Sequence, residues 1–235
     1  MRRLLLLSNS KNPGQEYLAH AIEPLRNLLG PIREMVFVPY AIVQRSPEEY
    51  TARVAELLQP AGITVRSVVA CPDPARMVVE AEAVAVGGGN SFQLLKRADE
   101  TGVLDALRSR ALAGMPYFGW SAGSNLACPT IRTTNDMPVV EPPSLTALGL
   151  IPFQINPHYT QATLPDHEGE TRDERIAEFL ALNPGVRVVG LREGSWLRVD
   201  GSTLALGGPH ALRLFEPGRM PCECQPTENL SFLLG

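Results

Sequence analysis

The sequence has few of the residues on which metal and imidazole chemistry depend. Its 235 residues include only four histidines and four cysteines. The histidines are His20, His158, His167 and His210. The cysteines are Cys71, Cys128, Cys222 and Cys224, and they lack the spacing of a zinc site. We therefore expect neither a metal nor another cofactor, and a mechanism based on imidazole has only four candidates.

Long apolar runs and an excess of positive charge are also missing. No run approaches the roughly 20 residues that a membrane-spanning helix needs. The apolar run Leu4–Leu7 is too short for a signal peptide, and polar residues follow it at once. The formal net charge of −4 argues against nucleic acid as the main partner. We expect a cytoplasmic protein without nucleic-acid or membrane partners.

The first half of the chain alternates between strand-like and helix-like segments. The expected strands are residues 3–7, 35–40, 63–69, 83–86 and 115–119, and the expected helices are residues 15–29, 47–58, 74–81, 91–96 and 102–113. Each strand-like run is apolar throughout, as in parallel strands that are covered on both faces. This pattern predicts a three-layer α/β fold with a doubly wound, mostly parallel sheet.

The second half is richer in loops and proline, especially between Asn135 and Pro157. A capping box at Thr171 predicts a helix that ends near Leu182. Short strands are expected at residues 186–191, 196–200, 203–206 and 211–215, which would form a small C-terminal β-meander. We predict one α/β domain over residues 1–235, in which residues 216–235 are an exposed tail of unknown role.

The sharpest local motif is Gly119-Trp-Ser-Ala-Gly123, between an expected strand and a helix-compatible stretch. This G-x-S-x-G pattern is typical of a nucleophile elbow, in which a tight turn presents the serine at the edge of the sheet. Ser121 is therefore the candidate nucleophile, and the N–H of Ala122 is a candidate oxyanion donor. The alternative is an ordinary strand-to-helix turn.

A second motif, Gly87-Gly-Gly-Asn90, also follows a strand and precedes a helix. Such strand ends line the binding crevice of an open α/β sheet. The N–H of Gly88 or Gly89 can supply a second oxyanion donor, and Asn90 is a candidate substrate-binding residue. A phosphate-binding loop is the weaker interpretation, because neither of its glycine patterns is present.

A serine nucleophile needs a base, and the sequence favours His158 for this role. It follows an apolar stretch, and Pro157 fixes the backbone before it. His20 is expected to be structural, His167 lies in a polar loop, and His210 is the second candidate.

Two carboxylates could orient the imidazole. Asp136 would give the chain order Ser–Asp–His of α/β hydrolases, whereas Glu193 ends an expected strand at the crevice. Spacing alone does not decide between them.

Several segments together resemble peptidase E, the family of α-aspartyl dipeptidases. They are residues 4–10, 87–95, 119–138, 154–158, 169–172 and 207–209, and the block from Gly119 to Pro138 is the most specific. The resemblance implies a cytosolic serine peptidase that removes N-terminal aspartate from dipeptides. It also implies a fold similar to class I glutamine amidotransferase domains, with serine in place of cysteine.

Carried over by position, the resemblance implies Ser121 as nucleophile, His158 as base and Glu193 as orienting acid. Asp136 stays the alternative acid. Around Glu193 the chain departs from the family, which usually has proline before the glutamate and asparagine after the next glycine.

The resemblance also makes Arg172 the candidate for binding the aspartate side chain, since a guanidinium can hold a carboxylate with two parallel hydrogen bonds. A small dipeptide is the expected partner, and a homodimer is a possible assembly. The rival functions are a cyanophycinase-like hydrolase of aspartyl–arginine links and a non-catalytic binder of acidic ligands.

Overall fold

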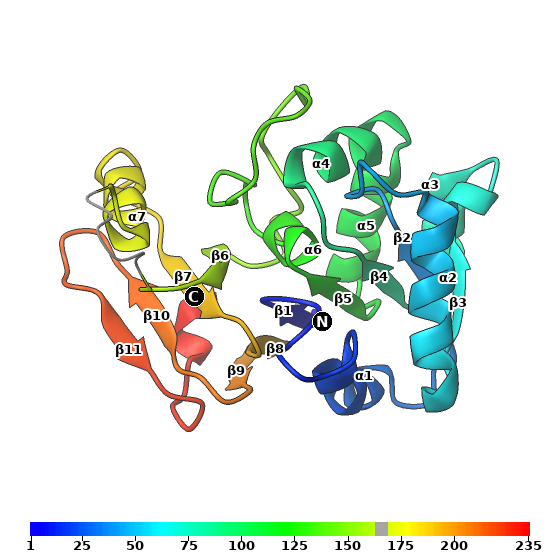
Figure 1. Ribbon diagram of the computed structural model, residues 1–235, viewed down its shortest axis with the longest axis horizontal. Helices are drawn as coiled ribbons and strands as arrows, with labels where there is room; N and C mark the ends of the chain where they lie inside the picture. Colours follow the sequence, from blue (N-terminus) through cyan, green and yellow to red (C-terminus); the bar gives the residue numbers. More distant parts are fainter. Residues whose placement is uncertain (163–168) are drawn as a thin grey trace.

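The computed structural model describes residues 1–162 and 169–235, and within them the strands form two sheets (Figure 1). The larger sheet has the spatial order β3-β2-β4-β5-β1-β8-β9. Its strands are β1 (Arg3–Leu7), β2 (Glu34–Val38), β3 (Thr64–Ser67), β4 (Val84–Val86), β5 (Tyr117–Trp120), β8 (Trp196–Asp200) and β9 (Thr203–Gly207). The first five run parallel to one another, β8 runs antiparallel to β1, and β9 runs antiparallel to β8.

The smaller sheet has the order β11-β10-β7-β6. Its strands are β6 (Gln154–Tyr159), β7 (Val188–Arg192), β10 (Leu212–Phe215) and β11 (Cys222–Cys224). The helices are α1 (Ile22–Leu29), α2 (Pro47–Leu58), α3 (Pro74–Glu80), α4 (Ser91–Glu100), α5 (Val103–Leu112), α6 (Ala122–Leu126) and α7 (Arg172–Ala181). None of the helices described is long and apolar enough to cross a membrane.

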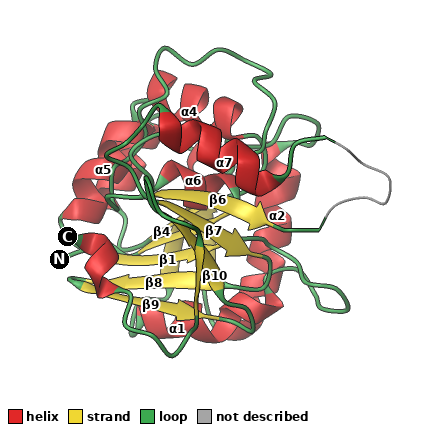
Figure 2. Cartoon of the chain, turned by 90° about the vertical axis from the view of Figure 1, so that its left-hand side faces the viewer, coloured by secondary structure: helices red, strands yellow, loops and turns green. Residues whose placement is uncertain are grey.

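Strand β1 lies inside the large sheet, between β5 and β8, and is buried on both faces. Leu4 and Leu6 belong to the core cluster under α3 to α6, whereas Leu5 and Leu7 belong to the cluster under α1 and α2. Figure 2 shows α1 on the opposite side of the sheet from α4, α5 and α6. The predicted three-layer, mostly parallel fold is confirmed, since apolar runs of this kind require cover on both sides.

The late strands do not form the expected meander. β8 and β9 extend the large sheet beside β1, whereas β7 and β10 join the smaller sheet. β8 and β9 form a hairpin that is joined by a two-residue turn, Gly201-Ser202. The late strands are divided between the two sheets because the turn after β7 carries the chain from the small sheet to the large one.

The C-terminal segment is not the exposed tail that the sequence suggested. Residues 222–224 form β11, which pairs with β10, and Cys224 is buried. Leu230 and Leu233 are also buried in the main core. The polar, proline-containing stretch 225–229 separates the cysteines of this segment from its last apolar residues, so no strand or helix period shows in the sequence.

Helix α6 begins directly after β5 and packs tightly against β4. A Cβ atom added to Gly123 would lie 2.1 Å from the carbonyl oxygen of Val86, and one added to Gly119 would lie 2.6 Å from the carbonyl oxygen of Gly123. Both neighbours are backbone atoms, which cannot rotate away. The two glycines of the motif are therefore required by the close approach of strand and helix.

We expect the substitution Gly123→Ala to lower the free energy of unfolding by about 1–3 kcal/mol, the usual cost of overpacking. Chemical denaturation measures this change. Gly185→Ala is the matched control, because Gly185 has nothing within 4 Å of an added Cβ and does not need a positive φ. Equal unfolding midpoints for the two variants would contradict this account of the elbow.

Candidate active site

The elbow between β5 and α6 holds Ser121 in a backbone conformation that residues other than glycine rarely adopt, with φ 52° and ψ −113°. Ser124 stabilises the turn from inside, because its buried hydroxyl contacts the carbonyl oxygens of Leu7 at 2.7 Å and Gly119 at 2.9 Å. The Tyr117 hydroxyl donates to the carbonyl oxygen of Gly123 at 2.7 Å. These contacts hold the strained serine at the end of the sheet.

Ser121, His158 and Glu193 form one hydrogen-bonded chain. The Ser121 Oγ lies 2.8 Å from Nε2 of His158. On the other side of the ring, Nδ1 lies 2.6 Å from Oε1 of Glu193. This is the order nucleophile, base and orienting carboxylate that serine hydrolases use. The structure thus brings together the three side chains that the sequence singled out, and their catalytic roles remain a prediction.

The imidazole is positioned by a strand that the sequence did not reveal. His158 lies in β6, at an irregularity in the pairing with β7, and has a φ of 54°. Its N–H donates to the Oγ of Ser8 at 2.9 Å, and the Ser8 hydroxyl donates to the carbonyl oxygen of Leu191 at 2.7 Å. Ser8 is fully buried just after β1. It therefore joins the backbone beside the base to the backbone two residues before Glu193.

Glu193 lies in the turn between β7 and β8, beside Gly194, which has a φ of 82°. The N–H of Gly194 donates to Oδ1 of the buried Asn9 at 2.8 Å. The N–H of Ser8 donates to the carbonyl oxygen of Ser195 at 3.0 Å. Ser8 and Asn9 are positioning residues that sequence reasoning missed, although both lie in a segment that carried the resemblance. Short polar residues after a strand are equally typical of an ordinary turn.

Ser121 and His158 line a cleft of about 430 Å³, together with Gly88, Gly89 and Asn90. A Cβ atom on Gly88 would lie 3.0 Å from the Cβ of Ser121, so this backbone directly adjoins the nucleophile. Ala122 is the first residue of α6, where an N–H has no acceptor within the helix. The expected oxyanion donors thus lie on two segments next to Ser121, and their role remains a prediction.

One side of the cleft is formed by three linked aromatic residues. Nε1 of Trp120 contacts the hydroxyls of Tyr17 at 3.1 Å and Tyr50 at 3.0 Å. The Tyr50 hydroxyl donates to the carbonyl oxygen of Gly88 at 3.2 Å. Burial raises the pKa of Tyr50 well above its usual value, which keeps this hydroxyl protonated. The aromatic group therefore connects the residue before the nucleophile to the glycine segment.

Asp136, the alternative acid, binds residues at the start of α4 and not His158. Its Oδ2 accepts hydrogen bonds from the N–H and hydroxyl of Ser91, both at 2.7 Å, and from the Thr134 hydroxyl at 2.9 Å. Asn90 caps the same helix, since its Oδ1 accepts from two backbone N–H groups of α4 and its Nδ2 donates to Met137. Both side chains order the start of α4 beside the cleft. The substrate-binding role of Asn90 stays a prediction.

Arg172 lies at the first position of α7 and lines a separate hollow of about 270 Å³. Its guanidinium contacts Oδ1 of Asn135. Nδ2 of Asn135 donates to the carbonyl oxygen of Pro157 at 2.7 Å, next to the imidazole residue. The structure therefore does not place Arg172 in the cleft at Ser121, but links it to the base through Asn135. Burial, and then the charge of Arg175, lower the pKa of Arg172.

His20 and His210 lie away from this chain of contacts. His20 is half-buried in a 3-10 turn, Ala19–Ala21, and burial lowers its pKa. This turn also replaces the first part of the expected helix at 15–29, because Leu18 adopts a left-handed conformation. His210 is exposed, and His167 lies outside the described residues.

An α/β fold with a serine–histidine–glutamate chain on a strand-to-helix elbow defines a serine hydrolase. The model of the family described as Peptidase family S51 matches residues 4–207. The chain therefore belongs to peptidase family S51 and is a serine peptidase, which confirms the resemblance found in the sequence.

Curated relatives named Peptidase E can be aligned with nearly the whole chain. It is 46% identical to a Peptidase E from Nostoc sp. (strain PCC 7120) over 99% of this chain and 97% of that protein. It is 49% identical to a Peptidase E from Salmonella heidelberg (strain SL476) over 92% of this chain and 94% of that protein. A crystal structure of a peptidase from an acI-B1 Actinobacterium has a TM-score of 0.71 at 17% identity, with 99% and 97% of the two chains covered, and shows the same fold.

The two candidate acids make different predictions. We expect Glu193→Ala to lower kcat by about 10²–10⁴-fold, because the imidazole loses its orientation and its counter-charge. We expect Asp136→Ala to affect mainly stability, by about 1 kcal/mol, because Asp136 holds a helix start. Steady-state kinetics and thermal unfolding of both variants separate the roles. Loss of activity in the Asp136 variant alone would assign the acid to that residue.

Proposed function

We propose that this peptidase hydrolyses dipeptides with N-terminal aspartate through a Ser121–His158–Glu193 mechanism. The observation that carries the proposal is the continuous pair of hydrogen bonds, 2.8 Å and 2.6 Å, that joins the three side chains, of which Ser121 and His158 line one cleft. A serine hydroxyl becomes an effective nucleophile only with such a base.

In this mechanism His158 accepts the proton of Ser121 as its Oγ attacks the peptide carbonyl. The N–H groups of Ala122 and of Gly88 or Gly89 stabilise the oxyanion. Protonated His158 then gives its proton to the leaving amine, and a water molecule, activated by the same imidazole, releases the acyl group. Glu193 holds the ring in one orientation and stabilises the imidazolium. Apart from the water molecule, all of these steps use groups of the chain itself, so we propose that no cofactor takes part.

Arg172 is the residue that we propose binds the aspartate side chain. Among the described residues, no carboxylate lies within ion-pair distance of its guanidinium, which is half-buried. The link through Asn135 to Pro157 couples the guanidinium to the strand that bears His158. A partly desolvated cation of this kind favours an anionic ligand over a neutral one of equal size.

The cleft at Ser121 supports a small substrate. Its volume of about 430 Å³ is in the range of small-ligand sites. Away from the nucleophile it is lined by Ile42 and Tyr17, and by two arginines, Arg45 and Arg53. This lining suits an apolar residue after aspartate that ends in a free carboxylate.

We also propose that the peptidase acts in the cytoplasm, which is the location that the sequence resemblance to the peptidase E family implies. Fractionation of cells that produce the protein, followed by an activity assay of each fraction, tests this location.

The nucleophile is tested by Ser121→Ala. We expect kcat for Asp-Leu to fall by about 10⁴-fold or more with the fold intact, because no acyl-enzyme can form. Mass spectrometry after treatment with a sulfonyl fluoride should find the label on Ser121 of the unsubstituted enzyme and none on the variant. Near-normal turnover by the variant would refute the mechanism.

The aspartate preference is tested by comparing Asp-Leu with Asn-Leu. A site built to pair a carboxylate should disfavour the neutral analogue by about 10³-fold or more in kcat/KM. We expect Arg172→Met to remove most of this difference by impairing Asp-Leu alone. Comparable turnover of both dipeptides by the unsubstituted enzyme would rule out the proposed specificity. The aspartyl–arginine polymer serves as a further substrate, because its cleavage in place of Asp-Leu would identify a cyanophycinase-like activity.

A further inference from the structure

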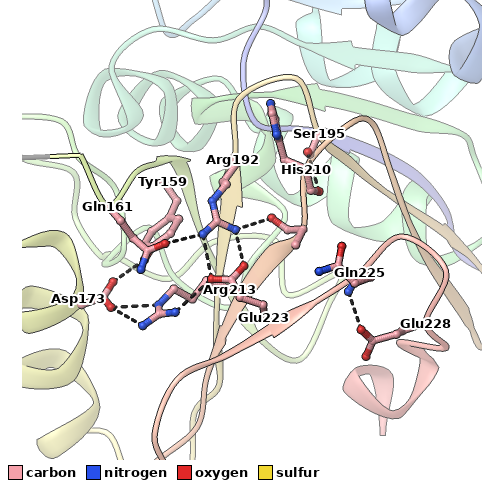
Figure 3. Close-up of polar contacts among 11 residues, drawn as sticks. Tyr159, Gln161, Asp173, Arg192, Ser195, His210, Arg213, Glu223, Gln225 and Glu228 are labelled. Carbon is pink, nitrogen blue, oxygen red and sulfur yellow. Dashed lines mark hydrogen bonds and ion pairs between the residues drawn. The ribbon is translucent and has the colours of Figure 1, made fainter.

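Glu223, on the C-terminal strand β11, binds Arg213 on the adjacent strand β10 and Arg192 on β7, the next strand of the sheet (Figure 3). Its two oxygens accept hydrogen bonds from Arg192, with Nη1–Oε2 at 2.6 Å and Nη2–Oε1 at 2.9 Å. Oε1 also accepts from Nη1 of Arg213 at 3.1 Å. The arginine side chains are only 21% and 18% exposed, so solvent screens these pairs less than it screens surface ion pairs.

The same network contains a second carboxylate, Asp173. Its Oδ2 accepts from Nε of Arg213 at 3.0 Å and lies 2.8 Å from Nη2. The Tyr159 hydroxyl donates to its Oδ1. Burial, and then this hydrogen bond, raise the pKa of Tyr159, which remains a donor at neutral pH. The network thus connects all four strands of the smaller sheet to the first turn of α7.

Three of the five members of this network are direct chain neighbours of the proposed functional residues. Tyr159 follows His158, and Arg192 precedes Glu193. These two are cross-strand partners in β6 and β7. Asp173 follows Arg172. Glu223 lies beyond residue 207, where the match to the family ends.

The three functional residues depend on the network to different degrees. The backbones at His158 and Gly194 are also held by the buried side chains of Ser8 and Asn9. The start of α7 is held against β6 and β10 by Asp173 through Tyr159 and Arg213. If Glu223 loses its charge, Arg213 keeps Asp173 as its carboxylate partner. Arg192 keeps only the carbonyl oxygen of Ala211 and Oε1 of Gln161 as hydrogen-bond partners among the described residues. Arg213 then pairs with Asp173 alone, which disturbs the balance at the start of α7.

We propose that Glu223 is a positioning residue for substrate binding, which fixes Arg213 and Asp173 and through them the placement of Arg172. This inference rests on the proposed aspartate-binding role of Arg172. It gives the C-terminal segment a part in specificity while leaving the chemistry at Ser121 to the hydrogen-bonded triad.

The test compares Glu223→Gln with Glu228→Gln. Glu228 lies in the same segment and accepts only the N–H of Gln225, at 2.7 Å, among the contacts of the described residues. We expect Glu223→Gln to raise KM for Asp-Leu about tenfold, the effect of one lost charge-assisted hydrogen bond. The kcat and the rate at which a sulfonyl fluoride labels Ser121 should stay near those of the unsubstituted enzyme. Glu228→Gln should leave all three quantities unchanged.

Each other outcome is decisive. An unchanged KM would overturn the positioning role, because Glu223 would then have no effect on substrate binding. A labelling rate that falls together with kcat would also overturn it, because the substitution would then disturb the structure of the whole site. If the Gln variant does not fold, Glu223→Asp carries the test, because it keeps the charge with a shorter reach and should raise KM while the labelling rate stays constant. An unsubstituted enzyme that fails to cleave Asp-Leu would instead refute the proposed function, and this inference with it.

Discussion

The strained turn at Ser121 is the constraint on which the site depends. A non-glycine residue with a φ of 52° is tolerated only where its surroundings fix it. Here the carbonyl oxygen of Val86 approaches Gly123 too closely for any side chain, and Ser124 and Tyr117 bind the backbone of the turn. The energy for this strain comes from the buried core of the sheet. In return, the hydroxyl is presented beyond the strand end, where an imidazole can reach it.

The residues after β1 connect the two sheets at the site. Ser8 and Asn9 are buried polar residues, and each uses its side chain to bind backbone from the second half of the chain. Buried polar groups are stable only when their partners are in place. The geometry of the proposed base and acid is therefore set by the residues that follow β1, and the imidazole can be placed within hydrogen-bonding distance of the serine although it lies on a different sheet.

Much of this arrangement could be predicted because it is encoded locally. The apolar runs of the first half and the glycine spacing around Ser121 depend on neighbours within a few residues. The strand that carries His158 could not be predicted, because Asn156 and Pro157 break its apolar pattern and its hydrogen bonds come from distant segments. Spacing could not separate Glu193 from Asp136, since their difference lies in which partner each carboxylate meets. The ion pairs of Glu223 and Asp173 could not be predicted from a periodic pattern either, because they join residues of three different strands and a helix.

The order of the site residues along the chain bears on how the enzyme is made. Chains emerge from the ribosome N-terminus first, so the elbow and the glycine segment exist before the base and the acid are synthesised. β1 finds β5 in this first part, but β8, its partner on the other edge, begins only at Trp196. A nascent or truncated chain thus carries a serine without its imidazole, and such a hydroxyl is a poor nucleophile. On the proposed mechanism, peptidase activity requires synthesis to have passed Glu193, so the topology itself keeps the enzyme silent during the earlier part of translation.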